Sequence, residues 1–295
     1  EAIDKDSYAG AFFKSKKDNL HTIQVGKNLY SSSSYNFKEG LVSSKPSDVY
    51  DINVADDFWL NRSFRQEEEK MLAEAPLKDK VYRYSCVNFI LLKEMVERIS
   101  GETMDKLLYR EYFRPMKLER LTYLPLRKFS KEQIAPTVKN DFLRRKSPVL
   151  QGYVHDEAAA FQGGVSGNAG LFSNANDLAK VLQLYLNQGS YGGEQYLSKE
   201  TCRLFTQSKS PTCRRGLGFD KPVAGGGKAS PCGSLAPASV YGHTGFTGTC
   251  FWVDPDNNLL YIFLSNRVNP TRANNKLGSL DIRTRIQDAI YKAIK

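Results

Sequence analysis

The sequence predicts an α+β fold, and two observations carry that prediction. Residues 239–265 contain three short segments rich in β-forming side chains, separated by turn residues. Amphipathic helical periodicity appears in the middle of the chain and again at its C-terminal end. An antiparallel meander covered by helices is a layered arrangement that buries the apolar faces of both kinds of element.

Length and composition are those of an ordinary globular protein. The 295 residues include 41% hydrophobic and 25% charged side chains, with a formal net charge of +10, so wholesale disorder is excluded. No apolar run approaches the roughly 18 residues of a membrane-spanning helix. The basic residues are scattered in small clusters such as Lys14–Lys17 and Arg214–Arg215. This distribution favours a solvated surface, or attraction to anionic cell-envelope polymers, over nucleic-acid binding.

The N-terminal segment, residues 1–80, shows no sustained periodicity. We expect it to be mostly irregular, with strands possible at Leu20–Val25 and Val49–Val54. Irregular segments of this length are uncommon in a self-contained domain. We therefore expect residues 1–80 to continue a fold that begins upstream of Glu1.

Helical patterns follow from residue 82 onward. The apolar residues between Val87 and Ile99 cover much of a helix circumference and predict a buried helix, which Gly101 ends. A second helix is expected after Thr103 and before Pro115, and a third after a Ser173 cap. Residues 117–150 and 208–236 are expected to be mainly loop.

The C-terminal residues give the clearest pattern. We expect strands at Ser239–His243, Thr249–Asp254 and Leu259–Ser265, with a hairpin turn at residues 254–258. A final amphipathic helix carries its apolar residues on one face: Ile282, Ile286, Ala289, Ile290 and Ala293.

The five cysteines do not form a metal-binding pattern. They are widely spaced and contain no C-x-x-C pair, so we expect no structural zinc. One disulfide among Cys202, Cys213 and Cys232 and five free thiols are both compatible with the spacing. The adjacent residues His155–Glu157 cannot all face one ion, and we predict neither a metal nor another cofactor.

Two short motifs could carry chemistry. The first, Tyr82-Arg83-Tyr84-Ser85-Cys86, stands directly before the predicted helix. A tyrosine at such a position can act as a proton carrier in a cleft, or it can simply pack its ring against the helix. The second, residues 243–249 (HTGFTGT), ends a predicted strand, where exposed N–H groups can stabilise an oxyanion; an ordinary turn would look the same.

Together the two motifs resemble the penicillin-recognising serine hydrolases, on the branch of class C β-lactamases, D,D-peptidases and related esterases. The resemblance covers roughly residues 80–295, with Tyr84-Ser85-Cys86 similar to the second family motif and His243-Thr244-Gly245 to the third. The stretches 154–157 and 163–173 are also similar to this branch. The resemblance implies a β-lactamase/transpeptidase-like fold, with an antiparallel sheet flanked by helices and a helical subdomain.

The chain looks most like the module found behind family 3 β-N-acetylhexosaminidases in Gram-negative bacteria. This resemblance implies an upstream glycoside hydrolase domain, a periplasmic or cell-envelope location, and a muropeptide or other small-molecule substrate. Residues 81–295 would form the hydrolase domain, helical over about 81–205 and carrying the sheet and final helix over about 206–295.

The chain departs from the family pattern in three ways. No lysine is preceded by a serine three residues earlier, so the Ser-x-x-Lys nucleophile motif is absent from this sequence. Cys86 stands where the family has asparagine. His243 gives the His-Thr-Gly form of the third motif and not the Lys-Thr-Gly form, which points away from a dedicated β-lactamase, because histidine is not reliably cationic at neutral pH. We therefore expect a C-terminal part of an acyl-transfer hydrolase of amides or esters, inactive by itself.

The resemblance assigns roles to individual residues. Tyr84 would share proton transfer, His243 would line the catalytic cleft, and Cys86, Thr244, Gly245 and Phe246 would contact the substrate. The alternative is a non-catalytic module that binds wall peptides in a cleft of the same shape. If the hydrolase interpretation is right, Tyr84 and His243 converge on one cleft, and apolar surface is exposed where a nucleophile helix would pack.

Overall fold

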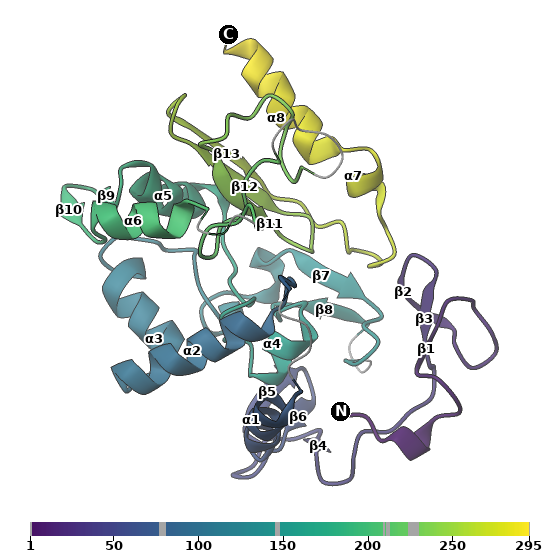
Figure 1. The fold of residues 1–295 in the computed structure, drawn as a ribbon. Coiled ribbons are helices and arrows are strands. Elements are labelled where there is room, and N and C mark those ends of the chain that lie inside the picture. Colours follow the sequence, from purple (N-terminus) through teal and green to yellow (C-terminus); the bar gives the residue numbers. More distant parts are fainter. Residues whose placement is uncertain are drawn as a thin grey trace. The chain divides into compact units, whose positions relative to one another are not determined.

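Five antiparallel sheets and eight α-helices occur in the part of the chain that the structure, a computed structural model, describes. The described residues are 2–76, 81–144, 148–208, 210, 213–223 and 230–294. They divide into two compact units, each assembled from separate stretches of the chain (Figure 1). The first unit comprises Glu1–Asp105, Tyr123–Leu171 and Arg267–Asn275, and the second comprises Lys106–Thr122, Phe172–Asn266 and Lys276–Lys295.

Two small sheets open the first unit. One has the order β1-β3-β2 and the other β4-β6-β5. Their strands are β1 (Phe13–Lys14), β2 (Ile23–Gly26), β3 (Leu29–Ser31), β4 (Val42–Ser43), β5 (Ile52–Ala55) and β6 (Phe58–Leu60). The N-terminal segment is therefore richer in strands than its sequence indicates, although β2 and β5 overlap the two expected strands.

The core of the first unit lies between β5, β6 and the helix α4 (Glu157–Phe161). Val54, Leu60 and Ala159 are almost completely buried there. The unit also contains α1 (Phe64–Glu74), α2 (Val87–Ser100) and the hairpin of β7 (Pro136–Lys139) and β8 (Val149–Gln151). α3 (Met104–Leu108) begins in this unit and continues into the second as a π-helical turn, Tyr109–Phe113.

A three-stranded meander forms the centre of the second unit. Its strands are β11 (Tyr241–Thr244), β12 (Cys250–Asp254) and β13 (Leu259–Phe263), paired in chain order. Side chains alternate between the two faces, as they must in a pleated sheet. Trp252 packs on the face covered by α8 (Ile282–Ala293), whereas Val253 packs on the face covered by α5 (Ala175–Leu186). The sheet is thus flanked by a helix on each face.

Smaller elements complete the second unit. The hairpin of β9 (Ser190–Tyr191) and β10 (Glu194–Gln195) follows α5, and α6 (Lys199–Thr206) comes next. The short helix α7 (Lys276–Ser279) precedes α8. No described helix has the length and apolar character needed to span a membrane.

The expected C-terminal strands, hairpin and final helix are confirmed, as is the helix that ends before Pro115. The α5 cap is one residue later than expected, because the Asn174 side chain accepts from the Asp177 N–H. The expected loops at 117–150 include β7 and β8. The glycines at 225–227, part of the expected loop at 208–236, lie outside the described residues.

Candidate functional site

The tyrosine motif stands at the start of α2. Ser85 Oγ accepts a hydrogen bond from the Val87 N–H at 3.1 Å and satisfies one donor of the first helical turn. Cys86 occupies the N-cap position and is partly exposed. Tyr84 precedes the helix with 61% of its surface exposed, so its ring is not packed away in the core of the first unit.

A glycine holds α2 close to the loop at residues 163–170. A Cβ added to Gly167 would lie 2.1 Å from the carbonyl oxygen of Phe89 and 3.3 Å from Lys93 Cβ. Only a residue without a side chain permits this approach. The loop is fixed in turn, because Tyr123 Oη donates to the Ser166 carbonyl and Asn168 Nδ2 donates to Asp156 Oδ1.

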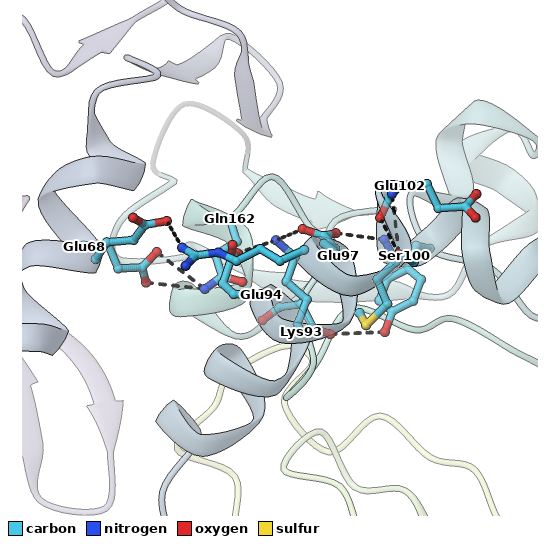
Figure 2. A network of polar contacts seen from close by, with 12 residues as sticks. Glu68, Lys93, Glu94, Glu97, Ser100, Glu102 and Gln162 are labelled. Atoms are coloured by element: carbon cyan, nitrogen blue, oxygen red, sulfur yellow. Dashed lines mark hydrogen bonds and ion pairs between the residues drawn. The ribbon is translucent and has the colours of Figure 1, made fainter.

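A buried ion-pair network stabilises the middle of α2. Lys93 Nζ lies 2.8 Å from Glu94 Oε1 and 2.8 Å from Glu97 Oε2 (Figure 2). Burial alone would lower the pKa of Lys93, but the two glutamates outweigh it and raise that pKa above its ordinary value. Glu97 also accepts from the Met104 N–H, so the same network ties α2 to the start of α3.

The apolar face of α2 is the main correction to the helix predicted from the sequence. Only Ile90 and Lys93 are buried on this helix. Six apolar residues are instead exposed: Val87, Leu91, Leu92, Met95, Val96 and Ile99. The helix forms as predicted, but its apolar surface is not covered as the sequence pattern suggests.

The second motif lies on β11, at one edge of the meander. His243 pairs with Phe251 and Thr244 with Cys250 in the antiparallel register. The neighbouring Gly242 is required by packing, because an added Cβ would lie 2.0 Å from the Phe251 carbonyl oxygen and 2.7 Å from the Trp252 ring. Trp252 therefore covers the strand immediately before the motif.

The outer edge of β11 is partly occupied. Asp220 forms an isolated bridge with Gly242, in which the two residues exchange hydrogen bonds of 2.7 and 3.0 Å. By the alternation of an antiparallel ladder, the Thr244 N–H faces this same outer edge, two residues further on. Gly245 donates to the Thr249 carbonyl at 2.8 Å and closes the turn to β12. Phe246 lies in that turn and is 57% exposed.

The hydrogen bonds of His243 define its tautomer. Arg215 Nη1 lies 3.0 Å from His243 Nε2, and a guanidinium can only donate, so Nε2 is the acceptor. Nδ1 then carries the proton and donates to the Thr244 carbonyl at 2.7 Å. These two contacts are those of the tautomer that carries its proton on Nδ1.

Sequence reasoning missed the group beside this histidine. Asp220, whose side chain is almost fully buried, forms ion pairs with Arg215 Nη2 and with Arg214 Nε, each at an N···O distance of 2.7 Å. The Arg214–Arg215 cluster is visible in the sequence, but nothing there shows that Asp220 pairs with the edge strand and directs the guanidinium of Arg215 to His243.

The two halves of the candidate site belong to different units. Tyr84 and Cys86 lie in the first unit, whereas His243, Thr244, Gly245 and Phe246 lie in the second. The structure describes each half by itself, and the convergence of Tyr84 and His243 on one cleft stays a prediction.

The remaining candidate groups of the sequence analysis are the cysteines, the possible metal ligands and His155. All five cysteines are free thiols. Among the described residues, no three His, Cys, Asp or Glu side chains form a group that could hold a metal ion. His155 is buried, and this burial, with Arg272 and Arg144 nearby, lowers its pKa to about 4.

Comparisons with known proteins place both motifs inside one family. The beta-lactamase family model matches residues 43–283. A protein of Escherichia coli O157:H7 named "Putative D-alanyl-D-alanine carboxypeptidase" is 32% identical over 98% of this chain and 70% of its own length. The protein of the same name from E. coli K12 is 38% identical over 72% of this chain and 53% of its own length, so this chain spans about half of that relative.

A solved structure supports the fold alone. A mutant simvastatin synthase from Aspergillus terreus matches 78% of this chain and 60% of its own, with 18% identity and a TM-score of 0.52. The chain has a beta-lactamase/transpeptidase-like fold, and it belongs to the beta-lactamase family.

Proposed function

We propose that this chain is the C-terminal part of a serine hydrolase that opens amide or ester bonds of cell-wall peptides through an acyl-enzyme. The family match over residues 43–283, which contains both motifs, carries the proposal. The name of the E. coli relatives supports a D-alanyl peptide as the substrate class. The serine nucleophile and its lysine lie outside this sequence, in which no serine stands three residues before a lysine.

The residues described here have the following roles in the proposal. Serine attacks the carbonyl, the leaving group departs with a proton, and water releases the acyl group. Tyr84 carries a proton between the serine and the leaving group, and its exposed position at the start of α2 supports that role. The Phe246 N–H supplies one oxyanion donor, while His243, Thr244, Gly245 and Cys86 line the substrate channel.

The exposed apolar face of α2 supports the missing-nucleophile part of the proposal. Such a face, with Leu91, Met95 and Ile99 at helical spacing, is suited to packing against another helix. We propose that the segment carrying Ser-x-x-Lys covers it. The substrate class further suggests a periplasmic or cell-envelope location, and the upstream glycoside hydrolase domain remains part of this proposal.

Labelling with a fluorescent penicillin tests the proposal. This chain alone should form no covalent adduct by intact-mass spectrometry, whereas the longer gene product should form one on its Ser-x-x-Lys serine. An adduct on this chain alone would contradict the assignment of the nucleophile. A longer gene product that lacks the motif, binds wall peptides and never hydrolyses them would instead establish the binding-module alternative.

A substitution tests the role of Tyr84 in the longer protein. Tyr84→Phe removes only the phenolic hydroxyl and should slow hydrolysis by about 10²–10⁴-fold, the usual contribution of a general acid–base group. Tyr82→Phe is the matched control, because Tyr82 lies two residues earlier and is similarly exposed, at 56% against 61%. If the two variants hydrolyse the substrate at equal rates, the Tyr84 hydroxyl does not take part in proton transfer and the ring has only a packing role.

A further inference from the structure

Gln162 carries a buried amide whose two ends are unequally satisfied. The residue ends α4, where its backbone N–H donates to the carbonyls of Ala158 and Ala159 and so fixes the base of the side chain. Gln162 is only 7% exposed. Its Nε2 faces Glu68, but its Oε1 accepts no hydrogen bond within the part of the chain that the structure describes. A buried amide oxygen without a donor is unfavourable.

Glu68 meets this amide because α1 packs on the end of α4. Phe64, one helical turn before Glu68, packs edge-to-face against Phe161, with the ring centroids 5.3 Å apart. Next to this pair, Gln162 Nε2 lies 3.5 Å from both carboxylate oxygens of Glu68 (Figure 2). Both distances are beyond the usual range of an N–H···O hydrogen bond, so the ionised carboxylate is held weakly.

The surroundings of Glu68 favour its protonated form. Burial raises the pKa of Glu68 above its ordinary value of 4.5, and the Glu94 carboxylate on α2 raises it further. The Gln162 donor and the charges of Lys93 on α2 and Arg65 on α1 oppose this rise without cancelling it. Glu68 therefore takes up its proton at a higher pH in the folded protein than in the unfolded chain.

We propose that Glu68 and Gln162 form a proton-dependent latch that fastens α1 to α4. A carboxylate can only accept hydrogen bonds, whereas a protonated carboxyl group has an O–H donor as well as an acceptor. Protonated Glu68 donates to Gln162 Oε1 and accepts from Gln162 Nε2, in a cyclic pair of two hydrogen bonds. Protonation thus supplies the donor that Oε1 lacks, and it removes the repulsion between Glu68 and Glu94.

The latch makes the attachment of α1 depend on pH. Glu68 binds its proton more tightly when α1 is docked, so the free energy needed to detach α1 rises as the pH is lowered from neutral toward 4.5. One proton changes this equilibrium by at most about tenfold per pH unit. Since α1 ends at Glu74, ten residues before Tyr84, the latch acts on the helix that precedes the tyrosine motif.

Hydrogen exchange of α1 tests the latch without reference to catalysis. Peptides that cover Phe64–Glu74 are followed by mass spectrometry in the longer gene product between about pH 7 and about pH 5, and each rate is compared with its intrinsic rate at that pH. In the wild type we expect the protection of α1 to rise roughly 2–10-fold toward acid, the effect of one hydrogen bond. In Glu68→Gln the new amide forms the same cyclic pair at every pH, so protection should be high already at neutral pH and should not rise further.

Two more variants separate the cyclic pair from an effect of charge or burial. Glu68→Met is also uncharged and similar in length, but it cannot donate to Gln162 Oε1. We expect α1 to be roughly 2–10-fold better protected in Glu68→Gln than in Glu68→Met, whereas burial alone would favour the apolar methionine. Glu67→Gln is the matched control, because Glu67 is exposed on the same helix. It should keep the pH dependence of the wild type.

Three results would overturn the latch. The first is protection of α1 that does not rise toward acid in the wild type, a measurement that needs no variant to fold. The second is protection in Glu68→Met that equals or exceeds that in Glu68→Gln. The third is a Glu67→Gln variant that behaves as Glu68→Gln does. Because the readout is the opening of α1 and not turnover, these outcomes are independent of the proposed hydrolase activity.

Discussion

Gly167 gives the sharpest test of how the tyrosine motif is positioned. In Gly167→Ala the new methyl group would lie 2.1 Å from the Phe89 carbonyl oxygen and 2.9 Å from its carbonyl carbon. Since real Cβ contacts essentially never fall below 3.0 Å, the loop and the helix must separate by about 0.9 Å. Both contacts are with backbone, so no side-chain rotation can relieve them.

The cost follows from what resists this separation. The loop on either side of Gly167 is fixed by hydrogen bonds from Tyr123 and from Asn168. Overpacking of this kind typically costs about 1–3 kcal/mol. For domains of 150–250 residues each kcal/mol lowers the melting temperature by about 2–4 °C, so we expect a decrease of roughly 2–12 °C.

The assay compares two glycine variants of the first unit by thermal unfolding. Gly26→Ala is the matched control, because its added Cβ meets only Leu29 Cβ at 3.5 Å and Leu29 Cδ2 at 3.8 Å, ordinary contacts. It should leave the melting temperature nearly unchanged. In the longer protein, Gly167→Ala should also slow hydrolysis, since a displacement near 1 Å can cost about 10²-fold in rate. Equal melting temperatures for wild type and both variants would show that the loop does not pack against α2.

Two further predictions concern stability. In the unfolded chain His155 becomes protonated as the pH falls below its ordinary pKa of 6.5. In the folded protein, burial and the charges of Arg272 and Arg144 keep the pKa of His155 at about 4. The free energy of unfolding should therefore fall as the pH is lowered from 6.5 to 4, by at most about 1.4 kcal/mol per pH unit. Urea unfolding at several pH values should show that the free energy of unfolding depends less steeply on pH in His155→Gln than in the wild type. Equal pH dependence in the two proteins would refute the reasoning. Tyr291→Phe removes the hydroxyl that donates to Asp254 at 2.6 Å in the buried interface of α8. It should cost about 1–3 kcal/mol by the same measurement, because a buried carboxylate loses a donor, and an unchanged free energy would refute that role.

The C-terminal half of the fold was predictable because its signals are local. A run of β-forming residues at 250–253 and turn residues at 254–258 indicate the hairpin without reference to the rest of the chain. Two N-terminal strands, unlike β2 and β5, were not predictable in the same way. β1 and β4 have two residues each, too short to show a period, and their pairing depends on partners elsewhere in the chain.

The helix α2 shows a different limit of sequence reasoning. Its apolar residues predicted a helix correctly, but they did not indicate how much of its surface the described residues cover. Hydrophobic periodicity reports which residues can be buried, not which partner buries them. The exposed Met95 and Ile99 therefore became visible only in the structure.

The surroundings of the third motif show what a short sequence motif does not indicate. In the sequence, His243 stands at a position where lysine occurs in other family members. The structure brings in Arg215, 28 residues earlier in the chain, through the bridge between Asp220 and the edge strand. Because that bridge is made by backbone groups, its Asp220–Gly242 pairing leaves no side-chain pattern in the sequence. The pairing of the two segments thus brings a guanidinium to His243, and the residues of the motif alone give no sign of it.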